Sequence, residues 1–205
     1  MPSAYAIQDD VLPEQILQAA LNLYQKYGLK KVTMEDVSKA IGKSRSALYY
    51  YYKNRDEIFE AVMDAIIKEV ADEITHAVNQ AESVEDKIRA FCLTKVKTSQ
   101  DRKSIFRAME AGMDAEEISR HGRIMGDLHN GMIKAETALL KSVLSECERD
   151  GSIRSLKPKE RGMVIFILLS SVRGIKREMA HEDDFSRLGT AVDTLTEMVM
   201  RWLRE

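Results

Sequence analysis

Apolar residues recur at helical spacing along nearly the whole chain, which predicts a protein built of helices. The first helix is marked by apolar residues that share one face: Ile16, Leu17, Ala20, Leu21 and Tyr24. Pro13 stands where a proline is tolerated in a first turn, and Gly28 follows the last apolar position, as glycine often does beyond a final turn. We therefore expect a first helix between Pro13 and Gly28.

Two short helices joined by a tight turn are predicted next. Thr33 is a strong N-cap, and Glu35 and Asp36 follow it in the first turn, where the helix dipole favours negative charge. Gly42 ends this helix, and Ser44 can cap another one almost at once. Such a helix, turn and helix within about twenty residues has the spacing of a helix-turn-helix. We predict this motif from roughly residue 33 to residue 50.

Similar signals predict several more helices in the rest of the chain. Asn54 with Glu57 resembles a capping box, and so does Ser83 with Asp86. The expected helices begin at residue 54, cover 83–97, 104–112 and 116–150, begin again at Pro158, and run from Asp183 or Asp184 to about residue 204. No alternation typical of strands is present, so the predicted fold class is all-α.

Composition supports this fold class and excludes other kinds of protein. Three prolines and ten glycines in 205 residues are too few for a loop-rich β sandwich. The longest apolar run, residues 163–169, is far shorter than the ~20 residues that cross a bilayer. Cys92 and Cys147 lack metal-binding spacing, and the N-terminus carries no export signal. We therefore expect a cytoplasmic protein with free thiols, no metal site and no membrane span.

Charge is unevenly distributed, although the net charge is only −2. Residues 30–55 carry seven lysines and arginines against two acidic residues, a balance of +5 that leaves −7 for the rest of the chain. A basic segment on an acidic body is typical of a protein that touches nucleic-acid phosphates with one end.

The start of the second helix of the motif carries side chains suited to base edges in a major groove. They are Lys43, Ser44, Arg45, Ser46 and Ala47. An arginine can bind guanine through two hydrogen bonds, serines can donate to bases or phosphates, and an alanine can meet a thymine methyl group. Each residue taken singly also fits a simpler role as a helix cap or as part of a solvated face. Their order within one helix-turn-helix favours DNA binding.

The tyrosine run 49–52 cannot be buried throughout, because successive residues point in different directions around a helix. Tyr49 lies one turn beyond Arg45, so we expect it on the side that faces the groove. Tyr52 is expected to pack inward, as is Leu48 with Val37. The pattern leaves Tyr50 and Tyr51 open.

Residues 16–59 resemble the tetracycline-repressor (TetR) family of bacterial regulators. The resemblance is carried by Ile16–Tyr24, Gly28, Val32-Thr33, Val37-Ser38, Ile41-Gly42, Ser44, Leu48-Tyr49 and Arg55–Ile58. It implies that Thr33, Tyr49 and Arg55 contact phosphates, and that the residues nearest the bases are Lys43, Ser44, Arg45, Ser46, Ala47 and Tyr50. Ala47 and Arg55 depart from the threonine and lysine usual in the family. Arginine keeps a phosphate partner, whereas alanine lacks the hydroxyl.

The resemblance also implies the organisation of the chain. It predicts a three-helix DNA-binding domain at residues 1–53, followed by a helical ligand-binding and dimerisation domain at residues 54–205. The last two helices would pair with those of a second copy in a four-helix bundle, and a small-molecule effector would bind among the helices before them. No cofactor is expected.

Candidates for the effector pocket are four flexible, polarizable methionines suited to an apolar ligand, together with one histidine: Met109, Met113, Met125, Met132 and His129. Methionines at helical spacing are also common in plain hydrophobic cores. His121, Met125 and His129 share a helix face, but a third metal ligand is missing from the pattern. Gly122, Gly126 and Gly131 are costly inside a helix, at about 1 kcal/mol each, so either close packing or a movable helix is expected there.

The function predicted from these features is a ligand-responsive transcriptional regulator, most simply a repressor, that binds a pseudo-palindromic operator in double-stranded DNA as a homodimer. The first alternative is a sequence-independent DNA-binding or architectural protein, which would carry the same basic segment. An enzyme is not expected, because no paired acid and base, nucleophile motif or phosphate loop is evident. Action through another protein stays open.

Overall fold

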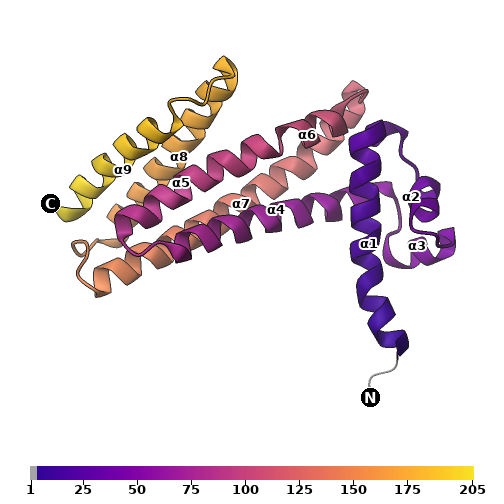
Figure 1. Cartoon of the computed structure of the whole chain (residues 1–205), viewed down its shortest axis with the longest axis horizontal. Helices are drawn as coiled ribbons and strands as arrows, with labels where there is room; N and C mark the ends of the chain where they lie inside the picture. The colour runs from indigo at the N-terminus through magenta and orange to yellow at the C-terminus, as the bar shows by residue number, and fades with distance from the viewer. Residues whose placement is uncertain (1–3) are drawn as a thin grey trace. The chain divides into compact units, whose positions relative to one another are not determined.

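The computed structural model describes the backbone of residues 4–205 and the side chains from Leu12 onward. This part of the chain is helical and contains no strand, so the all-α prediction is confirmed (Figure 1). The helices are α1 (Ala4–Tyr27), the short 3-10 helix η1 (Leu29–Lys31), α2 (Met34–Ala40), α3 (Arg45–Tyr51), α4 (Arg55–Gln80), α5 (Val84–Asp101), α6 (Lys103–Glu110), α7 (Ala115–Arg149), α8 (Pro158–Glu182) and α9 (Leu188–Arg204). Within residues 4–205, none of these helices has the length and apolar character that crossing a membrane requires.

Two predicted helix starts are wrong. The first helix begins well before Pro13, which therefore lies inside α1 rather than in its first turn. The last helix begins at Leu188 and not at Asp183 or Asp184. Asp183 instead ends α8 in the left-handed conformation, with φ +51°, and the Asp184 amide bonds back to the Met179 carbonyl at 3.1 Å. An aspartate tolerates the left-handed conformation. Asp183 therefore ends α8 and does not cap the start of α9.

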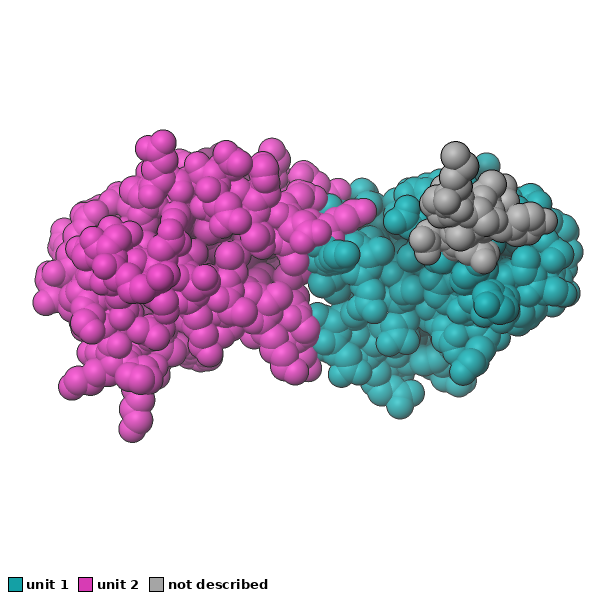
Figure 2. Space-filling view, turned by 90° about the horizontal axis from the view of Figure 1, so that it is seen from below, with its two compact units in different colours: residues 1–68, 102–129 teal, residues 69–101, 130–205 magenta. Residues whose placement is uncertain are grey.

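The chain forms two compact units, each with its own hydrophobic core (Figure 2). Unit 1 comprises the chain up to Lys68 together with Arg102–His129, and unit 2 comprises Glu69–Asp101 and Asn130–Glu205. Both α4 and α7 therefore contribute one part to each unit. The functional boundary that we predict after residue 53 is a different division, and it stays a prediction.

The core of unit 1 joins the helix-turn-helix to α6 and the start of α7. Tyr24, Leu48 and Phe59 are buried from α1, α3 and α4, and Met109 of α6 packs into the same cluster. The Phe59 ring meets the Tyr24 ring edge-on at 6.2 Å and the His121 ring at 4.6 Å. Burial raises the pKa of Tyr24 well above its usual value. These contacts make residues from α6 and α7 part of the DNA-binding unit's core.

Gly28 allows the chain to pass very close to the end of α6. It adopts φ +78°, and a Cβ at this position would lie 2.7 Å from the carbonyl oxygen of Ala111. Both the backbone conformation and the lack of space therefore require glycine here. The prediction that Gly28 ends the first helix is confirmed. The close approach to Ala111 is a second reason why this position requires glycine.

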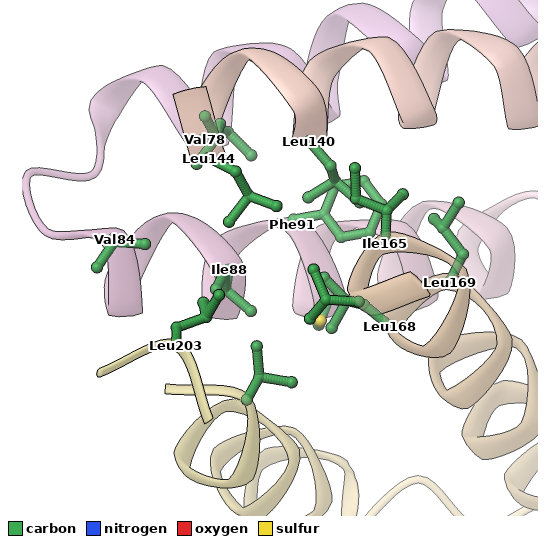
Figure 3. Close-up of a cluster of buried hydrophobic side chains, with 14 of the residues drawn as sticks. Val78, Val84, Ile88, Phe91, Leu140, Leu144, Ile165, Leu168, Leu169 and Leu203 are labelled. Atoms are coloured by element: carbon green, nitrogen blue, oxygen red, sulfur yellow. The ribbon is translucent and has the colours of Figure 1, made fainter. Parts of the chain in front are cut away.

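The core of unit 2 is formed by the end of α4, where Ile74 and Val78 are buried, together with α5, α7, α8 and α9. Figure 3 shows Phe91, Leu140 and Ile165 from three of these helices meeting in this core. Cys92 and Cys147 are free and buried, and burial raises the pKa of the Cys92 thiol to about 12. This thiol therefore stays protonated and serves as a small apolar core residue.

The glycines of α7 do not mark a break or a tight contact. The helix is continuous from Ala115 to Arg149. A Cβ on Gly122, Gly126 or Gly131 would meet nothing within 4 Å in this chain. Close packing within the chain is therefore wrong as an explanation, and α7 is not broken in this conformation; that the helix moves when a ligand binds stays a prediction.

Candidate nucleic-acid interface

The helix-turn-helix is positioned by local hydrogen bonds that the sequence predicted. The hydroxyl of Thr33 accepts from the Asp36 amide at 3.2 Å, and the Thr33 amide donates to the Asp36 carboxylate at 2.9 Å. Together they form a capping box at the start of α2. The Thr33 hydroxyl also donates to the Asp36 carboxylate at 2.6 Å, and this bond, followed by the one from the Thr33 amide, lowers the pKa of Asp36. Two polar groups at the exposed end of α2 are thereby held in fixed positions.

The turn between α2 and α3 is tight and closed by backbone hydrogen bonds. Gly42 adopts φ +64°, and the Lys43 amide donates to the Ser38 carbonyl at 3.0 Å. Ser44 then caps α3, since its hydroxyl accepts from the Ala47 amide at 3.2 Å. Leu48 is fully buried and holds α3 against the core of unit 1. The two helices contact each other directly, as a helix-turn-helix requires (Figure 1).

Most of the candidate DNA-contact residues are exposed, namely Thr33, Lys43, Ser44, Arg45, Ser46, Tyr49 and Tyr50. Ala47 and Arg55 are half-buried. The Tyr50 side chain is 82% exposed, an unusual position for a large ring, and it packs edge-on against Tyr51. Tyr52 packs against the unit 1 core, as predicted. One outward surface thus gathers hydroxyl, cationic and aromatic groups at the start and side of α3.

Arg45 is held near its predicted groove position by an acidic neighbour. Glu35 of α2 lies 2.7 Å from Lys39 and 3.8 Å from the Arg45 guanidinium. The nearby Lys39 ammonium, followed by Arg45, lowers the pKa of the Glu35 carboxyl. These pairs are exposed and hence weak, so Arg45 can exchange this partner for a base or a phosphate.

Arg55 forms contacts within the protein, whereas the family resemblance implied only a contact with a phosphate. Its guanidinium donates to the Lys30 carbonyl at 3.1 Å and lies 3.6 Å from the carboxylate of Glu117 in α7. Lys30 reaches the same region, 2.8 Å from Asp114 and 3.4 Å from Glu117. The acidic start of α7 therefore holds two basic residues of the DNA-binding unit. Sequence reasoning missed this network, because its partners are far apart along the chain.

The candidate pocket residues do not form one site. Met109 is buried in the unit 1 core, and Met113 and Met125 pack against that core. His129 is exposed, whereas Met132 belongs to unit 2. The three methionines of unit 1 thus fit the simpler role of core residues as well as a pocket lining. Among residues 12–205, no group of histidine, cysteine and carboxylate side chains has the arrangement of a metal site.

An exposed, capped α3 beside α2 on a helical core defines the class of this protein, a DNA-binding protein of the helix-turn-helix type. Residues 16–62 match the model of the bacterial regulatory proteins of the tetR family. The matched segment contains α2 and α3 and agrees with the resemblance of residues 16–59, so the helix-turn-helix of this chain is similar to that of these transcriptional regulators.

Similar proteins include a transcriptional regulator and a protein with a similar fold. The chain is 26% identical over 153 residues to the uncharacterized HTH-type transcriptional regulator YvaF of Bacillus subtilis, covering 72% of this chain and 73% of that one. It is 29% identical over 97 residues to the nucleoid occlusion factor SlmA of Glaesserella parasuis, covering 47% and 48%. The fold is similar to that of the regulator FadR from Bacillus subtilis in complex with stearoyl-CoA, with a TM-score of 0.60, 13% identity and coverage of 91% and 97%. These relatives are regulators or DNA-associated factors and not enzymes.

Proposed function

We propose that this regulator is a ligand-responsive repressor that binds a pseudo-palindromic operator as a homodimer. The observation that carries the proposal is the exposed start of α3, where Lys43, Ser44, Arg45 and Ser46 project from a helix anchored by Leu48. Side chains at the N-terminal end of a recognition helix reach base edges in the major groove. The capping bonds of Thr33 and Ser44 leave both hydroxyls exposed beside that helix, where a phosphate can bind.

A homodimer through α8 and α9 is supported by a patch of exposed apolar side chains. This α8–α9 patch comprises Met163, Phe166, Ile167, Met198 and Trp202, which are 39–66% exposed in the single chain. The two helices pack on each other, and the Arg154 guanidinium covers the Trp202 ring at 4.4 Å. An exposed apolar patch is unfavourable in water and typically marks an interface. A second copy would cover it with the same patch across a two-fold axis.

Response to a small molecule is proposed from the helical unit that follows the DNA-binding helices, and from the similar regulator whose structure contains stearoyl-CoA. A ligand that binds the DNA-incompetent conformation more tightly lowers operator affinity by that difference, commonly ~1–3 kcal/mol. We propose the same linkage between effector and operator for this chain.

The proposal is tested by selecting bound sequences from a random DNA pool at near-physiological salt. We expect the wild type to recover a two-fold-symmetric site and Arg45→Ala to relax the base preference within each half-site, because one bidentate contact contributes about 1–3 kcal/mol of discrimination. Lys134→Ala, which removes an exposed lysine of α7, is the control and should recover the wild-type site. Failure of the wild type to enrich any sequence would reject the operator-specific regulator.

A second candidate, DNA binding without transcriptional control, is favoured by the similarity to a protein named as a nucleoid occlusion factor. The same selection separates the two. Strong, salt-dependent retention of DNA without an enriched sequence would support the sequence-independent role.

The Arg55–Glu117 contact leads to a separate prediction. Glu117→Gln should raise affinity for DNA of any sequence by about two- to fivefold, because it releases Arg55 and Lys30 for phosphates. The dependence of binding on salt should become steeper as well. Glu116→Gln is the matched control, since Glu116 is 85% exposed and pairs with Arg120 instead. A weaker complex with Glu117→Gln would mean that the contact positions Arg55 rather than competing for it.

A further inference from the structure

Three helices of unit 2 each place a charged residue on the stripe that otherwise builds the hydrophobic core. Each lies one helical turn from a buried core residue: Lys95 from Phe91 in α5, Glu136 from Leu140 in α7, and Lys176 from Val172 in α8. Charged side chains are seldom found on the buried face of a helix unless they are paired. Three of them at corresponding positions of neighbouring helices therefore require an explanation.

The three side chains form one polar group inside unit 2, together with Ser99. The Lys95 ammonium donates to Oε1 of Glu136, and the Glu136 side chain is only 3% exposed. The Lys176 ammonium donates to the Ser99 hydroxyl at 3.2 Å. We call Lys95, Ser99, Glu136 and Lys176 the charged core cluster.

The charged core cluster is not balanced by its own residues. Two ammonium groups face one carboxylate, and burial, followed by the charge of Lys95, lowers the pKa of Lys176. The second carboxylate oxygen of Glu136, Oε2, is buried and has no hydrogen-bond partner among the described residues. The cluster thus has an excess positive charge and an acceptor that lacks a donor.

A purely structural ion pair would not have this composition. One lysine and one carboxylate with both oxygens paired would be enough to join α5 and α7, and unsatisfied buried groups destabilise such a pair. Lys176 and the unpaired Oε2 of Glu136 are not needed for an ion pair that only joins α5 and α7. They are useful for a molecule that brings a negative charge and a hydrogen-bond donor.

We propose that the charged core cluster binds the acid group of the effector, an organic acid with a hydroxyl next to its carboxylate and an apolar body. The carboxylate would bind Lys176 and Lys95, and the hydroxyl would donate to Oε2 of Glu136. The apolar body follows from the surroundings, because the neighbouring stripe positions of the same three helices are apolar core residues. This inference rests on the proposed function of the chain as an effector-responsive regulator.

The test is calorimetric titration of the full-length protein, without DNA, with four eight-carbon probes at one ionic strength. We expect 2-hydroxyoctanoate to bind most tightly, octanoate less tightly, and 1-octanol and octylamine weakest, because only the first has both the charge and the donor. Equal affinity for the acids, the alcohol and the amine would overturn the proposal.

Two variants with opposite expected effects exclude a merely structural role. Lys176→Met should weaken octanoate binding by about tenfold or more, the loss expected for a hydrogen bond between charged groups. Glu136→Gln should strengthen octanoate binding, because it removes a negative charge beside the acid group. Lys97→Met removes an exposed lysine of the same helix as Lys95 and should change nothing. A loss of octanoate binding in Glu136→Gln equal to that in Lys176→Met would overturn the proposal.

The result also separates this inference from the proposed function. Acid binding together with no operator in the DNA selection would reject the repressor and keep the binding site. An operator without preferential acid binding would reject the binding site and keep the repressor.

Discussion

Phe166→Asp is expected to convert the proposed dimer into monomers and to lower operator affinity by about a hundredfold, because each half-site would then be bound without the other. Phe166 is 62% exposed in the single chain and lies in the α8–α9 patch. An aspartate there would be desolvated in the proposed four-helix interface, whereas it is solvated in a monomer. Light scattering gives the oligomeric state, and titration of a fluorescent operator gives the affinity.

The control for this variant is Ile118→Asp. Ile118 is 58% exposed but lies in α7, outside the α8–α9 patch. Ile118→Asp should leave the oligomeric state unchanged and should lower operator affinity far less than Phe166→Asp does. A dimeric Phe166→Asp with normal melting behaviour would place the dimer contact elsewhere.

Leu48→Ala should lower the free energy of unfolding of unit 1 by about 2–5 kcal/mol, the range observed when buried leucines are truncated. The effect on α3 should be severe, because α3 has 7 residues and isolated helices of that length are unstable in water. Leu48 is the buried residue that anchors it. Chemical denaturation measures the stability, and hydrogen exchange of residues 45–51 shows whether α3 stays ordered.

Operator binding should fall along with the order of α3. Leu48→Met, which keeps the volume of the side chain, should cost less than about 1.5 kcal/mol and bind nearly as the wild type does. An ordered α3 with normal DNA binding in Leu48→Ala would show that contacts other than this side chain hold the recognition helix.

The local parts of the fold and of the DNA interface were predictable from the sequence. The caps at Thr33, Ser44 and Asn54 bind partners within four residues. Their hydrogen bonds can therefore be predicted from the neighbouring residues in the sequence. The start of α1 was not predictable in the same way. Proline fits the first turn of a helix and is unfavourable further inside, and the residues before Pro13 lack a clear apolar pattern. The sequence therefore indicated a start at Pro13 that the structure places earlier.

Long-range pairs could not be predicted, because nothing in a sequence states which distant charges meet. Lys30 and Asp114 are 84 positions apart, and Lys95 and Glu136 are 41 apart. For the pair of Lys95 and Glu136, the sequence did indicate that one of the two residues is buried. Glu136 continues the apolar stripe of Leu140, Leu144 and Cys147, so its place on a buried face was visible although its partner was not.

The close approach of Gly28 to Ala111 has a consequence for the construction of hybrid regulators. Exchange of the first 53 residues between relatives would transplant Gly28 and Tyr24 but leave behind Ala111, Met109 and His121, which complete the same core. A chimera cut at that point would therefore combine one protein's half of a packed core with another protein's half. Grafts that carry the chain up to Lys68 together with Arg102–His129 keep the packing intact and are the better starting point for altering operator specificity.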